Sequence, residues 1–73
     1  MPTTVDQYEG VILRVHANGY AFIGCVGKPD AFAHFGDFVG FEELGERLKG
    51  RRVLCCLRRG VKGYEAYDVR PAD

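Results

Sequence analysis

The chain lacks tryptophan and serine altogether, contains a single methionine, and carries no net charge at pH 7. Without serine, the hydroxyl nucleophile of many hydrolases is missing. There is also no GxxxxGK phosphate-binding loop, no carboxylate pair in a recognisable context and no metal-ligand spacing. We therefore expect a protein without enzymatic activity, cofactor or bound metal.

The cysteines are Cys25, Cys55 and Cys56, an odd number with two members adjacent, and this pattern fits neither a disulfide framework nor a CxxC metal knuckle. Reduced and buried thiols are typical of cytosolic proteins, so we expect a cytoplasmic location. The first residues have neither the basic start nor the apolar run of a signal peptide. No stretch approaches the roughly 20 apolar residues that cross a bilayer, and no membrane association is expected.

With 73 residues the chain has room for one hydrophobic core. Residues 1–7 show no apolar periodicity and are expected to be a flexible lead-in to a domain that spans 8–71. Charge is unevenly distributed: acidic side chains predominate up to residue 46, whereas residues 47–62 contain basic side chains and no acidic ones. A local basic edge is therefore predicted despite the zero total.

Five segments have the composition and boundaries of β-strands, and the Asn18-Gly19 pair predicts a tight hairpin between the first two. The expected strands are 8–16, 20–26, 31–35, 52–59 and 64–70. Between the third and fourth, Phe41, Leu44 and Leu48 recur at helical spacing, which predicts a short helix of about two turns. The predicted fold is all-β: a five-stranded antiparallel OB-fold barrel with a short helix between strands 3 and 4. An SH3-like barrel is the main alternative.

Large and small side chains alternate around the turn that joins the second and third strands. Tyr20 and Phe22 share one face of the second strand, while Phe32 and His34 share one face of the third. A turn of odd length would place Phe22 opposite His34 and make one continuous aromatic face. The inner positions are filled largely by alanine, which suggests that the aromatic face is open to a flat ligand such as a nucleic-acid base.

Three motifs resemble those of cold-shock domains. Residues 19–23, Gly-Tyr-Ala-Phe-Ile, are similar to the first ribonucleoprotein motif, and residues 31–35, Ala-Phe-Ala-His-Phe, to the second. Residues 60–69 resemble the closing Gly-x-x-Gly-x-x-Ala-x-x-Val hairpin. The resemblance implies an OB barrel that binds single-stranded RNA or DNA by base stacking, as an RNA chaperone or a regulator of transcription or translation. The implied stacking residues are Tyr20, Phe22, Phe32, His34 and Phe35.

The first strand departs from the family pattern. Where the family has Lys-x-Lys-Trp-Phe, residues 11–15 read Val-Ile-Leu-Arg-Val, so a stacking tryptophan, a phenylalanine and two lysines are missing. Arg14 could compensate in part because guanidinium groups stack on bases and attract phosphate. A strand of nucleic acid that crosses the barrel would also pass near Lys62. We expect weaker affinity than in a typical relative, with RNA and DNA undistinguished.

A second hypothesis concerns the apolar positions where the family tends to be polar. Alternation places Val11 and Leu13 opposite Ile12, and Leu54 and Cys56 opposite the inward side chains of their strand. An exposed strip of these four residues would support a homodimer or another protein partner, with nucleic-acid binding reduced. Coverage of the strip by the middle insertion and the N-terminal tail is the alternative.

Overall fold

The computed structural model describes residues 7–72. Of the predicted lead-in, only Gln7 belongs to this range, and residues 1–6 lie outside it. The strands are β1 (Tyr8–His16), β2 (Tyr20–Cys25), β3 (Ala31–His34), β4 (Arg52–Gly60) and β5 (Gly63–Pro71). Each lies where the sequence predicts a strand, with ends that differ by one residue at most.

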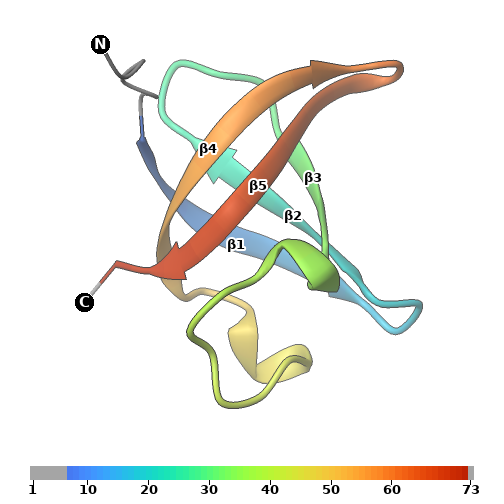
Figure 1. The fold of residues 1–73 in the computed structure, drawn as a ribbon, viewed down its shortest axis with the longest axis vertical. Helices are drawn as coiled ribbons and strands as arrows, with labels where there is room; N and C mark the ends of the chain where they lie inside the picture. Colours follow the sequence, from blue (N-terminus) through green and yellow to red (C-terminus); the bar gives the residue numbers. More distant parts are fainter. Residues whose placement is uncertain (1–6, 73) are drawn as a thin grey trace, which may run out of the picture.

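The five strands form a closed barrel in the order β1-β2-β3-β5-β4 (Figure 1). Closure comes from β4, which pairs with β1 in an antiparallel ladder as well as with β5. All neighbours are antiparallel except β3 and β5, which meet in parallel at Phe32 and Glu65. The architecture confirms the predicted OB-type barrel, with this parallel pair as an addition.

The predicted helix between strands 3 and 4 is wrong. This segment contains only two short 3-10 turns, η1 (Phe35–Asp37) and η2 (Glu46–Leu48), and lies at one end of the barrel in Figure 1. Gly45, in the middle of the predicted helix, has a φ of 166° and a ψ of −161°, an extended backbone conformation that an α-helix cannot contain. The apolar residues do not share one face either, because Leu48 is 2% exposed and Leu44 is 41% exposed.

The barrel interior combines a few branched side chains with many small ones. Ile12, Ile23 and Val53 are fully buried. The alanines of β2 and β3 are fully buried as well, as expected for residues that alternate with the outward aromatic rings. No buried polar or charged side chain occurs among residues 7–72. Small inner side chains let the barrel close tightly and leave the larger rings outside.

A β-bulge interrupts β1 and changes which of its side chains point outward. Ile12 pairs with Ile23 of β2, but the next pair is Arg14 with Phe22, so Leu13 is an extra residue without its own partner. Ile12 is buried, whereas Arg14 is exposed. Strict alternation would have put both on the inner face. The bulge instead puts Arg14 on the outer face and reverses the inward and outward positions that follow it.

The predicted apolar strip is only partly exposed. Val11 and Leu13 are 38% and 39% exposed, and Leu54 is half-buried. The expectation of an exposed Cys56 is wrong, because its exposed fraction is 5%. Cys56 lies outside the core cluster, as alternation predicts. Its partner across the sheet is Tyr67 of β5, and the larger Tyr67 side chain lies beside the small thiol.

Close contact between β1 and β2 at Gly10 generates a testable prediction. A Cβ atom at Gly10 would lie 2.9 Å from Cys25 Sγ, from the carbonyl oxygen of Gly24 and from Ile23 Cγ2. We expect Gly10→Ala to lower the free energy of unfolding by about 1 to 3 kcal/mol, since the barrel must shift to admit the methyl group. The control is Gly36→Ala, where a Cβ meets nothing within 4 Å. Urea denaturation that shows equal stability for the two variants would contradict this account.

Two of the thiols meet inside the barrel. The Sγ atoms of Cys25 and Cys55 are 4.0 Å apart, and both cysteines are free and buried. Burial, together with the neighbouring Cys25, raises the pKa of the Cys55 thiol from 9.0 to about 12. Cys55 therefore stays a neutral, weakly reactive thiol, in agreement with the prediction of reduced and buried cysteines.

The raised pKa predicts a loss of stability in alkali. Between pH 9.0 and about 12 the unfolded chain releases the Cys55 proton while the folded barrel retains it. The free energy of unfolding should consequently fall with rising pH, by up to about 1.4 kcal/mol per pH unit from this group. Denaturation curves measured across this range should show a shallower decline for Cys55→Ala. An identical pH dependence in both proteins would rule out Cys55 as the source.

Candidate nucleic-acid interface

The predicted aromatic face exists and spans β2 and β3. Tyr20 pairs with His34, and Phe22 pairs with Phe32. The expected pairing of Phe22 with His34 is therefore wrong, because His34 lies opposite Tyr20 instead. The connection has odd length, as expected, but the register is shifted by two residues, so that Ile23 and not Cys25 pairs with Ala31. All four side chains still point to the same side of the sheet.

Ring contacts join these four residues, which we call the aromatic platform: Tyr20, Phe22, Phe32 and His34. Phe32 is the centre, with ring centroids 4.9 Å from Tyr20, 5.8 Å from Phe22 and 4.7 Å from His34. The His34 and Phe22 rings stand nearly perpendicular to Phe32. Edge-to-face contacts of this kind stabilise the platform and hold its rings in fixed orientations.

The platform is separate from the hydrophobic core. The partly buried side chains that pack against the core include Tyr8, Val15, Phe38, Phe41 and Tyr64, but none of the platform rings. Tyr20, Phe22 and Phe32 are half-buried and His34 is exposed. These rings contact one another and solvent, so the fold keeps an aromatic surface that its own core does not use.

Arg14 joins the platform because of the β1 bulge. Its guanidinium carbon lies 5.2 Å from the centroid of the Phe22 ring, within the range of a cation–π contact. A planar cation thus lies over a platform ring at the position of β1 where the family pattern has tryptophan, and its compensating role stays a prediction. Its charge is available to a phosphate, and its plane to a base.

Sequence reasoning missed His16, the last residue of β1. Its ring stacks on Tyr20 with a centroid distance of 4.5 Å and an angle of 9° between the planes. The backbone N–H of Asn18 donates to His16 Nδ1 at 3.2 Å. Without knowledge of the bulge, alternation from Ile12 gives His16 inward parity, and nothing in the local sequence signals otherwise.

Phe35 belongs to a different group of rings. It begins η1 and contacts Phe38 at 5.8 Å, and Phe38 contacts Phe41 at 5.4 Å. Phe38 and Phe41 pack against the core, and Phe38 forms a backbone bridge with Val69 of β5. Phe35 remains half-buried beside the platform, with its backbone N–H bonded to the carbonyl of Gly19 at 2.9 Å.

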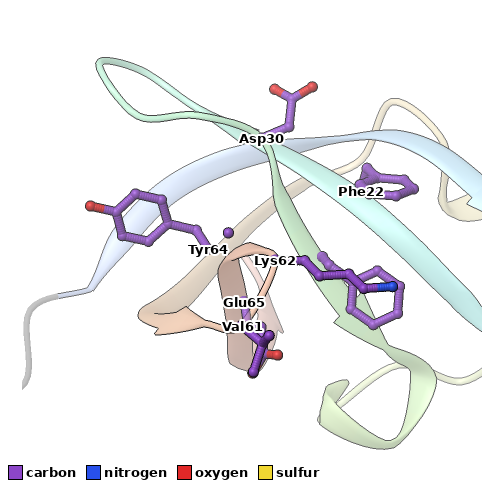
Figure 2. A pocket seen from close by; sticks show the side chains of 8 residues that line it. Phe22, Asp30, Val61, Lys62, Tyr64 and Glu65 are labelled. Atoms are coloured by element: carbon purple, nitrogen blue, oxygen red, sulfur yellow. The ribbon is translucent and has the colours of Figure 1, made fainter.

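Lys62 contributes to a pocket at the end of the platform formed by Phe22 and Phe32 (Figure 2). The pocket has a volume of about 480 Å³ and lies between β2, β3 and the β4–β5 hairpin. In Figure 2, Lys62 extends from the hairpin toward the side where Phe22 lies, while the Tyr64 ring points away. The lining residues are Phe22, Asp30, Phe32, Val61, Lys62, Gly63, Tyr64 and Glu65.

Ion pairs neutralise part of the predicted basic edge, residues 47–62. Within it Arg52 pairs with Glu9 and Arg58 with Glu65 at 3.1 Å; outside it Arg70 pairs with Asp68 at 2.8 Å. Each of these pairs is solvent-exposed and contributes little to stability. Their effect is electrostatic: they reduce the net positive field that the charge distribution of the sequence predicts.

Residues 7–72 hold neither a metal cluster nor a membrane-spanning helix. No cluster of three or more His, Cys, Asp or Glu side chains is placed to hold a metal ion in this range. Nor does any helix of the same range have the length and hydropathy to cross a membrane.

The comparisons with known proteins identify the fold. No protein-family model and no curated protein matches the chain. Among solved structures 28 chains match. One of them, described as "drosophila Unr CSD456", superposes with a TM-score of 0.77 over 94% of this chain at 16% sequence identity. This chain spans 28% of that chain's length. The class is therefore that of OB-type barrels with the fold of a cold-shock domain, as the sequence motifs suggested.

The separation of the platform from the core predicts different stabilities for two phenylalanine variants. We expect Phe38→Ala to lower the free energy of unfolding by about 1 to 3 kcal/mol because it removes a ring packed on the core. Phe22→Ala should lower it by about 1 kcal/mol or less, since Phe22 loses only platform contacts. Thermal and urea unfolding of both variants would measure this. An equal or larger loss for Phe22→Ala would mean that the platform is part of the structural core.

Proposed function

We propose that this protein binds single-stranded RNA or DNA without enzymatic activity, by stacking bases on the aromatic platform. One observation carries the proposal: a contiguous set of rings lies on one face of the barrel, exposed or half-buried, and does not pack against the core. A fold normally buries such rings, and an unburied aromatic surface is suited to a flat apolar ligand. The cold-shock fold adds support by analogy.

Stacking supplies affinity without sequence selectivity. Every base has a π-face, and each stacked base contributes about 1 to 3 kcal/mol. Two or three bases held by Phe22, Phe32 and His34 would give dissociation constants of about 1 μM to 1 mM once association costs are included. Transient, sequence-tolerant binding of this strength suits an RNA chaperone, or a regulator of transcription or translation, in the cytoplasm.

Phosphate contacts are few in this proposal. Arg14 lies over Phe22, and Lys62 lines the neighbouring pocket, but Asp30 lines the same pocket with the opposite charge. Phe35, half-buried beside the platform, completes the proposed set of binding residues.

The test is titration of the protein with short pyrimidine-rich oligonucleotides at low salt, followed by fluorescence anisotropy. Phe22→Ala and Phe32→Ala should each weaken binding about fivefold to a hundredfold, because each removes a stacking position. Tyr67→Ala is the matched control, since this ring lies on β5 and contacts Arg58 rather than the platform. Equal binding by all four proteins, or none by the wild type, would refute the proposal.

The salt dependence gives a second measurement. If Arg14 and Lys62 are the phosphate contacts, the logarithm of the association constant should fall with the logarithm of salt concentration with a slope of about −1 to −2. Arg14→Ala should flatten that slope by about 0.7, the release expected for one contact on a single strand. An unchanged slope would show that Arg14 does not meet phosphate.

A second candidate function is self-association, or binding of another protein, through the apolar positions of β1. The exposure of Val11 and Leu13 favours it. The predicted strip is nevertheless smaller than expected, because Cys56 is buried and Leu54 is half-buried. Light scattering distinguishes the two: this candidate requires a dimer or a stable complex without oligonucleotide binding, whereas the platform proposal is satisfied by a monomer that binds.

A further inference from the structure

Tyr20 has a neighbouring ring on either side. His16 of β1 is stacked on it at 4.5 Å and nearly parallel, and Phe32 of β3 lies 4.9 Å away at an angle of 34°. Because β2 lies between β1 and β3 in the sheet, these two rings come from the strands on either side of Tyr20. The three form a row across the strands with Tyr20 in the middle.

A base needs an unoccupied ring face in order to stack. His16 is stacked on Tyr20, and the Tyr20 ring is also contacted by Phe32 at 4.9 Å and by Phe22 at 5.9 Å. His16 is exposed and ends the row, whereas Tyr20 is half-buried. The free aromatic face at this end of the platform is therefore the outer face of His16, next to the β1–β2 hairpin.

A hydrogen bond fixes which nitrogen of the His16 ring can donate. Nδ1 accepts the backbone N–H of Asn18 at 3.2 Å, so the neutral ring carries its hydrogen on Nε2. Within residues 7–72 the hydrogen bond to Asn18 is the one made by the His16 ring. The Nε2–H group is thus left to donate to an oxygen of a bound nucleotide.

We propose that His16 is the outermost stacking position of the platform, and that it binds one further nucleotide through its exposed ring face and the Nε2–H group. Tyr20 acts as the support that holds the His16 ring upright. The inference rests on the proposed function, because the nucleotide on His16 continues a strand whose other bases stack on Phe22 and Phe32. It also assigns Tyr20 a supporting role in place of direct base stacking.

The geometry allows one competing arrangement, in which His16 swings aside and a base takes its place on Tyr20. The two arrangements predict opposite results when the imidazole is removed. If His16 is a stacking position, its loss weakens binding. If His16 covers the site on Tyr20, its loss leaves binding unchanged or strengthens it.

The experiment measures binding of an oligothymidine series that grows by one nucleotide at a time, with wild-type protein and with His16→Ala, His16→Leu and His16→Phe. We expect the alanine and leucine variants to bind the longer oligonucleotides about fivefold to tenfold more weakly, near the lower end of the contribution of one aromatic stacking position. The phenylalanine variant, which keeps a ring, should retain most of the affinity. The shortest oligonucleotides that bind should be affected little, because Phe22 and Phe32 hold them.

Control measurements distinguish a folding defect from a loss of binding, and a wrong role for His16 from a wrong proposed function. Circular dichroism and urea unfolding should show an unchanged fold for the variants, since His16 is exposed and lies at the end of β1. Equal or tighter binding by His16→Ala, with binding by the wild type intact, would overturn the role of His16 and leave the platform proposal standing. Absence of wild-type binding at every length would overturn the proposed function and this inference together.

Discussion

The bulge at Leu13 is the constraint on which the candidate interface depends. It inserts one unpaired residue into β1 between the Ile12–Ile23 and Arg14–Phe22 pairs. Ile12 can then remain in the core while Arg14 and His16 both point outward to the rings of β2. Without the extra residue, alternation would direct Arg14 into an apolar interior, where an unpaired guanidinium would cost far more than the barrel could offset. Core packing and the chemistry of the outer face are thus linked at a single backbone irregularity.

Side-chain size divides the molecule in the same way. The inner positions of β2 and β3 hold alanines, with Ile23 as the main branched side chain, and this lets the sheet curve closely around a small core. The rings on the alternate positions cannot enter that core, so they contact one another on the surface. The rings of the segment that follows β3 behave differently: Phe38 and Phe41 pack against the barrel and close its end. The chain therefore has two aromatic populations, and the outer one does not pack against the core.

Much of the fold is readable from local sequence, because strand alternation and turn chemistry act over a few residues. The Asn18-Gly19 turn and the aromatic alternation located β2 and β3 within one residue of their ends. Features set by contacts between distant segments were not readable. Leu13 carries no bulge signal such as glycine, so the outward position of His16 was missed. The helical spacing after β3 did not produce an α-helix, because Gly45 is extended and Leu48 packs into the barrel end. The β2–β3 register was also missed, because alternation gives the face of a side chain but not its partner on the next strand.

Charge explains why stacking must dominate in the proposed complex. The basic residues of β4 and β5 are largely engaged with carboxylates, as in the pairs Arg58–Glu65 and Arg70–Asp68. An exposed ion pair attracts a distant phosphate much less than an isolated cation does, because its two opposite charges largely cancel at distances greater than their separation. Salt screens the remaining field over a Debye length of about 8 to 10 Å. Among the described residues, Arg14 is the one cation that contacts a ring of the platform. Because that guanidinium lies over Phe22, it adds charge at the place where a base would stack, so the electrostatic and aromatic contributions act on the same nucleotide. The proposed function therefore requires flat, accessible bases, and it favours single strands over duplexes, whose bases are already stacked on each other.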